Sequence, residues 1–168
     1  VEGIFQSIGD AHCLDDTGTY VDGILQQRFI LLDEGIDTHG GSGNCNLHYW
    51  SNWELANLAS MLAIGIYLED YMVIDKVRHN FLAGEGSGCI DNMIPYAPIP
   101  DPDGYGMIAQ HMESGRDQGH GTLVVSMCAE LCQMAWNVGL DFWGEDANKV
   151  LAMAQYTAKY NAAPGGQY

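Results

Sequence analysis

The stretch WELANLASMLAIGIYL, residues 53–68, decides the fold of this chain. Its apolar side chains return every three or four positions, at Leu55, Leu58, Ala59, Leu62 and Ile66. Small residues lie between them, at Ala56, Ala63 and Gly65. Apolar residues at this spacing form one face of an α-helix, and small residues allow a second helix to approach closely. The stretch therefore predicts a helix that is buried on nearly all sides.

The flanks of this stretch predict the start of the helix and the element after it. The segment Ser51–Glu54 has the form of a capping box, so we expect the helix to begin near Trp53. Downstream, Asp70 precedes a second helical pattern over Tyr71–Leu82, and glycines at positions 84, 86 and 88 come after it. Two helices joined by so short a connection predict an αα-hairpin.

Three more helices are predicted, separated by loops rich in glycine or proline. Their ranges are Val21–Glu34, Thr122–Val138 and Ala147–Tyr160. Gly35 and Gly139 mark the ends of the first two, because glycine readily adopts the left-handed conformation that ends helices. Alternating helices and loops indicate stacked helical hairpins.

One segment is predicted to be a long non-helical loop. Pro95–Gly106 contains four prolines and two glycines, and loops of that length in compact domains are often functional. No strand pattern matches the strength of the helical ones, although short strands near Ile90–Tyr96 or Met107–Gln110 remain open. The predicted fold class is all-α.

The composition narrows the classes of partner. The 168 residues are 47% hydrophobic, enough for one core, and carry 22 Asp and Glu against six Lys and Arg, a formal charge of −16. Phosphate binding requires clustered basic residues, so this balance excludes nucleic acid. The same charge repels a polyanionic sugar at long range, so such a ligand would need local positive or hydrogen-bonding groups.

No run approaches the roughly 18 apolar residues of a membrane span, and Val1 opens no signal sequence, so we expect a mature, soluble chain.

Five cysteines are many for this length and, with few lysines, favour a secreted protein in an oxidising compartment. Cys128 and Cys132 stand four apart in a predicted helix, where a disulfide is awkward, so a bridge from Cys45 to Cys89 is favoured. The fifth cysteine is Cys13. Because the number of cysteines is odd, at least one of the five must be free or paired elsewhere. The alternative that all five are small buried hydrophobic residues stays open.

The segment QHMESGRDQGH, residues 110–120, concentrates polar chemistry immediately before a predicted helix. It holds two imidazoles, one guanidinium, two carboxylates and two amides. One interpretation is a solvated loop in which Asp117 caps the helix and Arg116 makes a surface ion pair worth at most about 1 kcal/mol. The other is a catalytic segment.

The octapeptide ESGRDQGH, residues 113–120, resembles the signature region of the alginate lyase superfamily, together with AWN at 135–137, GLD at 139–141 and YTAKYN at 156–161. Asn52-Trp53 and the helix that they open are similar to an earlier hairpin of that family. Its members fold as (α/α) toroids of stacked helical hairpins and cleave alginate or related polyuronates by β-elimination.

This resemblance covers residues 51–161, leaving a poorly matched segment at 1–50 and a tail at 162–168. The sequence predicts about five helices, roughly half of a complete toroid. We therefore expect the toroid to be incomplete in this chain. The remainder would come from a longer protein or from another chain.

The chemistry of polyuronate elimination suggests roles for the polar residues. The C5 proton becomes acidic when hydrogen-bond donors or a cation neutralise the neighbouring carboxylate, and Asn52, Arg116 and His120 are the candidates. A base must take this proton and an acid must protonate the leaving oxygen, which adds His111 as a candidate. The predicted catalytic residues are thus Asn52, His111, Arg116 and His120.

Substrate binding and the catalytic tyrosine are less narrowly assigned. The predicted binding residues are Trp50, Trp53, Tyr105, Glu113 and Gln118, with the two tryptophans stacking on a sugar ring. Glu113 and Asp117 are expected to orient Arg116 and His120. The candidates for the tyrosine are Tyr49, Tyr105, Tyr156 and Tyr160, although the last two, four apart on a helix, are more typical of a core.

No cofactor is implied, and His111, Glu113, Asp117 and His120 match no recognised zinc spacing. The predicted function is a polyuronate lyase acting on an acidic polysaccharide. Two alternatives stay open. The first is a glycoside hydrolase that uses two carboxylates, chosen from Glu54, Asp91, Glu113 and Asp117. The second is a module that binds uronates without turnover.

Overall fold

The computed structural model describes residues 50–162 and is mostly helical. Helices make up 64% of these residues and strands 4%, so the all-α prediction is confirmed for this part of the chain. The elements are α3 (Ser51–Leu68), α4 (Tyr71–Ala83), α5 (Ile90–Met93), β1 (Ile99–Pro100), β2 (Met107–Ile108), α6 (Gln118–Asn137) and α7 (Glu145–Ala162). Several predictions fall outside the described residues: the helix at 21–34, Tyr49, Cys13 and Cys45.

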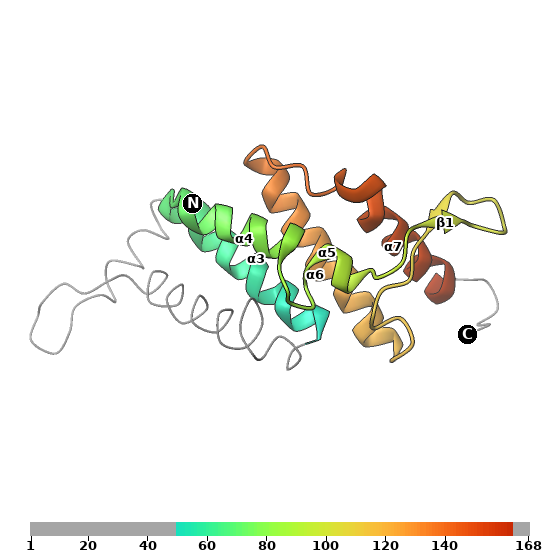
Figure 1. Cartoon of the computed structure of the whole chain (residues 1–168). Helices are drawn as coiled ribbons and strands as arrows, with labels where there is room; N and C mark the ends of the chain where they lie inside the picture. The colour runs from blue at the N-terminus through green and yellow to red at the C-terminus, as the bar shows by residue number, and fades with distance from the viewer. Residues whose placement is uncertain (1–49, 163–168) are drawn as a thin grey trace, which may run out of the picture.

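The predicted αα-hairpin is present and consists of α3 and α4 (Figure 1). α3 ends at Glu69, whose φ of 55° is left-handed, and Asp70 accepts hydrogen bonds from the backbone N of Met72 (3.0 Å) and of Val73 (3.3 Å) at the start of α4. The two helices approach closely at Gly65, where a Cβ would lie 2.9 Å from Cγ1 of Val73. The small residue predicted to permit close packing is therefore required at this position.

The predicted capping box at the start of α3 is wrong. The helix begins at Ser51, two residues before the predicted start, and its N-cap Trp50 makes no side-chain cap hydrogen bond. Glu54 turns instead to another segment, where its Oε2 accepts from Oγ of Ser87 (3.1 Å) and the backbone N of Gly88 (2.8 Å). The local sequence has the composition of a capping box, but Glu54 forms hydrogen bonds with a distant segment instead of with the start of its own helix.

The helix α6 runs alongside α3, and the two share the core (Figure 1). It begins at Gln118, four residues before the predicted start, because Asp117 caps it, and Gly139 (φ 87°) follows its end as predicted. The apolar core between α3, α4, α6 and α7 includes Leu55, Leu58, Leu62, Val77, Phe81, Val124, Leu131, Phe142 and Met153. The rings of Phe81 and Phe142 stack at 4.8 Å, which joins α4 to the segment before α7.

The segment predicted as a loop carries a small hairpin. β1 pairs antiparallel with β2, Ile99 opposite Ile108, so the possible strand at Met107 is confirmed, whereas Ile90–Met93 is helical. Lys159 of α7 fixes the hairpin through ion pairs with Asp101 (2.5 Å) and Asp103 (2.7 Å). The loop is thereby attached to α7.

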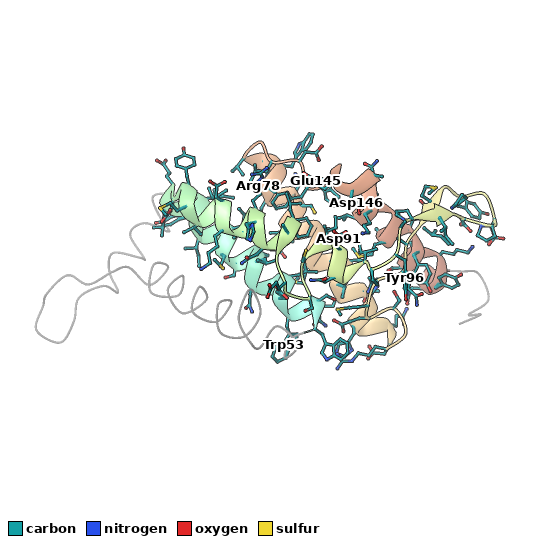
Figure 2. All side chains as sticks on the ribbon, in the orientation of Figure 1. Trp53, Arg78, Asp91, Tyr96, Glu145 and Asp146 are labelled. Carbon is teal, nitrogen blue, oxygen red and sulfur yellow. The ribbon has the colours of Figure 1, made fainter. Side chains whose placement is uncertain are left out.

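Lys149 of α7 is buried although it is charged. Its ammonium bridges Asp91 (2.7 Å) and Asp146 (2.8 Å), which lie on neighbouring elements in Figure 2. Burial lowers the pKa of Lys149, but hydrogen bonds to Asp146 and Asp91 outweigh it and raise the pKa overall. These ion pairs stand beside the left-handed turn at residues 146–148 that opens α7.

Two further predictions concern cysteines and membranes. The Sγ atoms of Cys128 and Cys132 lie 4.0 Å apart. The two cysteines do not form a disulfide with each other, as predicted for cysteines one helical turn apart. Cys89 is buried and forms no disulfide with another cysteine of residues 50–162, and the Cys45–Cys89 bridge stays a prediction because Cys45 is outside the described part. Within residues 50–162, no helix is long and apolar enough to cross a membrane.

Candidate active site

Glu113 is buried and joins the predicted signature segment to the start of α3. Its Oε1 accepts from the backbone N of Asn52 (3.2 Å) and from Oγ of Ser51 (3.4 Å). Its Oε2 accepts from Nδ2 of Asn52 (3.4 Å) and Nη1 of Arg116 (3.2 Å). The carboxylate therefore takes the place of the missing N-cap of α3, from 61 residues away.

This contact brings Asn52 and Arg116 together, because both donate to the same oxygen of Glu113. The Arg116 side chain is 46% exposed, so it keeps donors for a ligand while the buried carboxylate fixes its position. Glu113 contacts Arg116 from beneath the surface, and its role in orienting Arg116 for a reaction stays a prediction.

His111 is buried next to Glu113 and is held as a neutral imidazole. Its Nδ1 accepts from the backbone N of Glu113 (3.3 Å), which assigns the ring proton to Nε2. Burial lowers the pKa of His111 from 6.5 to about 4. At neutral pH its Nε2–H is thus a donor suited to an anionic group.

Asp117 and His120 form a second, more exposed pair at the start of α6. Oδ1 of Asp117 accepts from the backbone N of His120 (2.9 Å), and Oδ2 lies 2.5 Å from its Nδ1. The hydrogen bonds from the backbone and then the side chain of His120 lower the pKa of Asp117. The carboxylate holds the proton at Nδ1, so Nε2 of a neutral His120 can accept one.

A pocket of about 380 Å³ opens between the signature segment and α7. It is lined by His111, Ser114, Gly115, Arg116, Asp117, Gln118, Gly121, Tyr156, Thr157, Tyr160 and Asn161. The rings of Tyr156 and Tyr160 lie 4.6 Å apart at 47°, and burial, then the neighbouring Tyr160, raises the pKa of Tyr156. The tyrosines expected in a core thus line the pocket.

A separate concavity, the α3–α6 groove, has a volume of about 430 Å³. Its lining residues are Asn52, Trp53, Ala56, Asn57, Leu123 and Met127. Trp53, one of the predicted sugar-stacking residues, is exposed at the start of α3 (Figure 2). The groove is formed by the first two turns of α3 and by the second and third turns of α6.

The predicted site residues therefore divide between several places. Arg116, His111 and Gln118 line the pocket, whereas Asn52 and Trp53 line the groove. Tyr105 is exposed on the β1–β2 hairpin, and its backbone O accepts from Gln155. Neither Trp50, Tyr105, Glu113 nor His120 is among the residues that line the pocket.

Sequence reasoning missed Thr157, Asn161 and Ser114 as pocket residues. The spacing of Tyr156, Thr157, Tyr160 and Asn161 was a usable signal, because positions one turn apart share a helix face. Among residues 50–162, no group of three or more His, Cys, Asp or Glu side chains could hold a metal ion.

Comparisons with known proteins add no relative, since no family model, no curated protein and no solved structure matches this chain.

Proposed function

We propose that this chain is part of a polyuronate lyase of the alginate lyase superfamily, which cleaves an acidic polysaccharide such as alginate or a glucuronan-like polymer by β-elimination. The observation that carries the proposal is the pocket in which Arg116, His111 and a tyrosine pair converge. A cation, a neutral imidazole donor and phenols are the groups that this reaction requires.

The reaction needs the carboxylate of the bound uronate to be neutralised first. Arg116 supplies a charge-assisted contact, and Nε2–H of His111 supplies a second donor. These local groups oppose the repulsion expected from a net charge of −16.

Proton transfer is the second requirement. A base removes the C5 proton, its electron pair forms the C4–C5 double bond, and the C4–O4 bond breaks as O4 takes a proton. His120 is the proposed base: it does not itself line the pocket, but its Nδ1 lies 2.5 Å from Oδ2 of the pocket residue Asp117. Tyr156 and Tyr160 are the phenols available to protonate O4 from the pocket wall. Asn52 lines the groove and not the pocket, so its proposed part is to hold Glu113, which in turn holds Arg116.

A glycoside hydrolase is less well supported. Such an enzyme needs two carboxylates that face the substrate, but Asp117 is the one carboxylate among the described residues that line the pocket. Glu54 and Glu113 are buried and accept hydrogen bonds from the protein, and Asp91 forms an ion pair with Lys149. A uronate-binding module without turnover remains the second candidate, because binding needs only Arg116 and the pocket.

The toroid is part of the same proposal. Large apolar side chains that line neither the pocket nor the groove are exposed at the surface, among them Trp136, Val138 and Leu151. Further helical hairpins, from a longer protein or another chain, would cover such side chains. We also propose a secreted location, as the cysteine content favours.

The test is the ultraviolet absorbance of the unsaturated product on a panel of acidic polysaccharides. Arg116→Ala should lower turnover at saturating substrate by about 10²-fold, by analogy with loss of one oxyanion donor. Arg116→Lys should recover part of this, because an ammonium lacks the planar fork of a guanidinium. Circular dichroism checks that each variant is folded.

Arg78→Ala is the matched control, because Arg78 is an exposed arginine on α4, away from Trp53 in Figure 2. Turnover of Arg116→Ala within about threefold of the parent would show that Arg116 is structural. No absorbance with any polyuronate, together with measurable binding, would leave the binding module in place of the lyase.

A further inference from the structure

The α3–α6 groove is a second concavity, lined mainly by apolar side chains. Trp53 and Ala56 of α3 and Leu123 and Met127 of α6 form its apolar wall, and the other described lining residues are two asparagines. None of these residues is charged, in contrast to those of the pocket. An apolar groove between two helices is the kind of surface that receives the apolar face of a third helix.

The chain itself carries such a face before α3. Residues 21–34 lie outside the described part, and their sequence predicts an amphipathic helix. Leu25, Phe29 and Leu32 follow one another at spacings of four and three residues, so they share one side of that helix. Three large apolar side chains on one side match the apolar wall of the groove.

The covalent connection to α3 holds this segment near the groove. α3 begins at Ser51, and the next two residues, Asn52 and Trp53, line the groove. The connection between the segment and Trp50 is residues 35–49, which can reach about 50 Å at most. A tether of this length raises the effective concentration of the segment at the groove to about the millimolar range. A second copy of the chain in dilute solution therefore competes poorly for the same surface.

We propose that the α3–α6 groove is the docking site of the chain's own residues 21–34, which bind there as a third helix. The central residue of the apolar face, Phe29, packs against Leu123 and Met127 of α6 and Trp53 of α3. Trp53, which was predicted to stack on a sugar ring, is thereby assigned to packing within the chain. The inference does not rest on the proposed lyase, because it concerns a surface other than the pocket.

Hydrogen–deuterium exchange of the full chain, followed by mass spectrometry, tests the docking. The amides of residues 21–34 should exchange slowly in the parent. Leu123→Asp should speed their exchange about tenfold or more, because it places a charge against the apolar face, and should leave exchange in α7 unchanged. Val138→Asp is the matched control, because Val138 is 41% exposed, against 40% for Leu123, and lies at the other end of α6.

The reciprocal change lies in the segment itself. Phe29→Asp should speed exchange in the groove, at residues 51–57 and 121–127, because the docked face is lost. Gln27→Asp, on the opposite side of the predicted helix, should leave exchange there unchanged. This pair of variants tests the docking even if Leu123→Asp does not fold.

Three results would overturn the docking. The first is fast exchange of residues 21–34 in the parent, or exchange that Leu123→Asp leaves unchanged. The second is a parent dimer that Leu123→Asp converts to a monomer, measured by light scattering, which would assign the groove to a second copy. The third is weaker binding of a uronic acid tetrasaccharide by Trp53→Ala while exchange of residues 21–34 stays as in the parent, which would assign the groove to a sugar.

Discussion

The starts of α3 and α6 are stabilised by carboxylates only four residues apart in the sequence, Glu113 and Asp117, yet in different ways. Asp117 caps the helix that it directly precedes. Glu113 reaches the helix that begins 62 residues earlier, at Ser51, and is buried there. A local cap can be read from the sequence around it. A cap supplied by a distant residue cannot, even where the local sequence has the form of a capping box.

The two histidines of this segment differ in the same way as the two carboxylates, one being buried and the other exposed. His111 lies beside Glu113 in the buried network, and His120 lies beside Asp117 at the surface. The buried network joins two segments far apart in the chain, whereas the exposed pair stabilises one helical turn. We therefore expect changes at Glu113 and His111 to affect the whole fold, and changes at Asp117 to remain small.

The largest effect is expected for Glu113→Ala. This change leaves Oγ of Ser51 and the donors of Asn52 without their acceptor, at a cost of about 3 kcal/mol in the free energy of unfolding, measured in urea. Glu113→Gln keeps one carbonyl acceptor and should cost less than half as much. Glu130→Ala, at an exposed glutamate of α6, is the control. Equal stability of Glu113→Ala and Glu130→Ala would contradict a structural role for the buried carboxylate.

The fold was predictable where periodicity and local caps determine it. The αα-hairpin followed from apolar spacing and Asp70, and the end of α6 followed from Gly139. The start of α3 and the burial of Lys149 depend on partners more than 50 residues away, so no local pattern shows them. The short strand Ile99–Pro100 is formed by a proline-rich segment, whose composition predicts a loop.

The sequence could predict which segment carries the candidate site, but not which of the residues face the same concavity. The octapeptide at 113–120 placed Arg116 and Gln118 near one pocket. It could not show that Asn52 faces a different concavity, because that depends on how α3 and α6 pack side by side. The sequence left Tyr156 and Tyr160 open between a core and a catalytic position, since spacing alone does not tell which neighbour a helix face meets.

A smaller effect is expected from the titration of His111. Its pKa is lowered to about 4, so the unfolded chain, with a pKa near 6.5, binds the proton first as pH falls. Stability from the neutral imidazole is complete above pH 6.5 and declines between pH 6.5 and 4, by about 1 to 3 kcal/mol. His111→Gln should flatten this part of the stability curve, measured by urea unfolding across pH. His79→Gln, at an exposed histidine, should not, and an unchanged slope in His111→Gln would show that His111 is not the titrating group.

The smallest effect is expected for Asp117→Ala, which removes the local cap of α6. Oδ1 of Asp117 satisfies one free N–H, that of His120, and the carboxylate is half exposed, so water can replace it. We expect the melting temperature to fall by only about 3 °C, and Asp117→Asn, which keeps a capping oxygen, to remain within about 1 °C of the parent. The two variants should differ more in turnover, because neither an alanine nor an amide holds the proton on Nδ1 of His120 as the carboxylate does. A melting temperature lowered as much as in Glu113→Ala would mean that the exposed pair supports the fold as strongly as the buried network does.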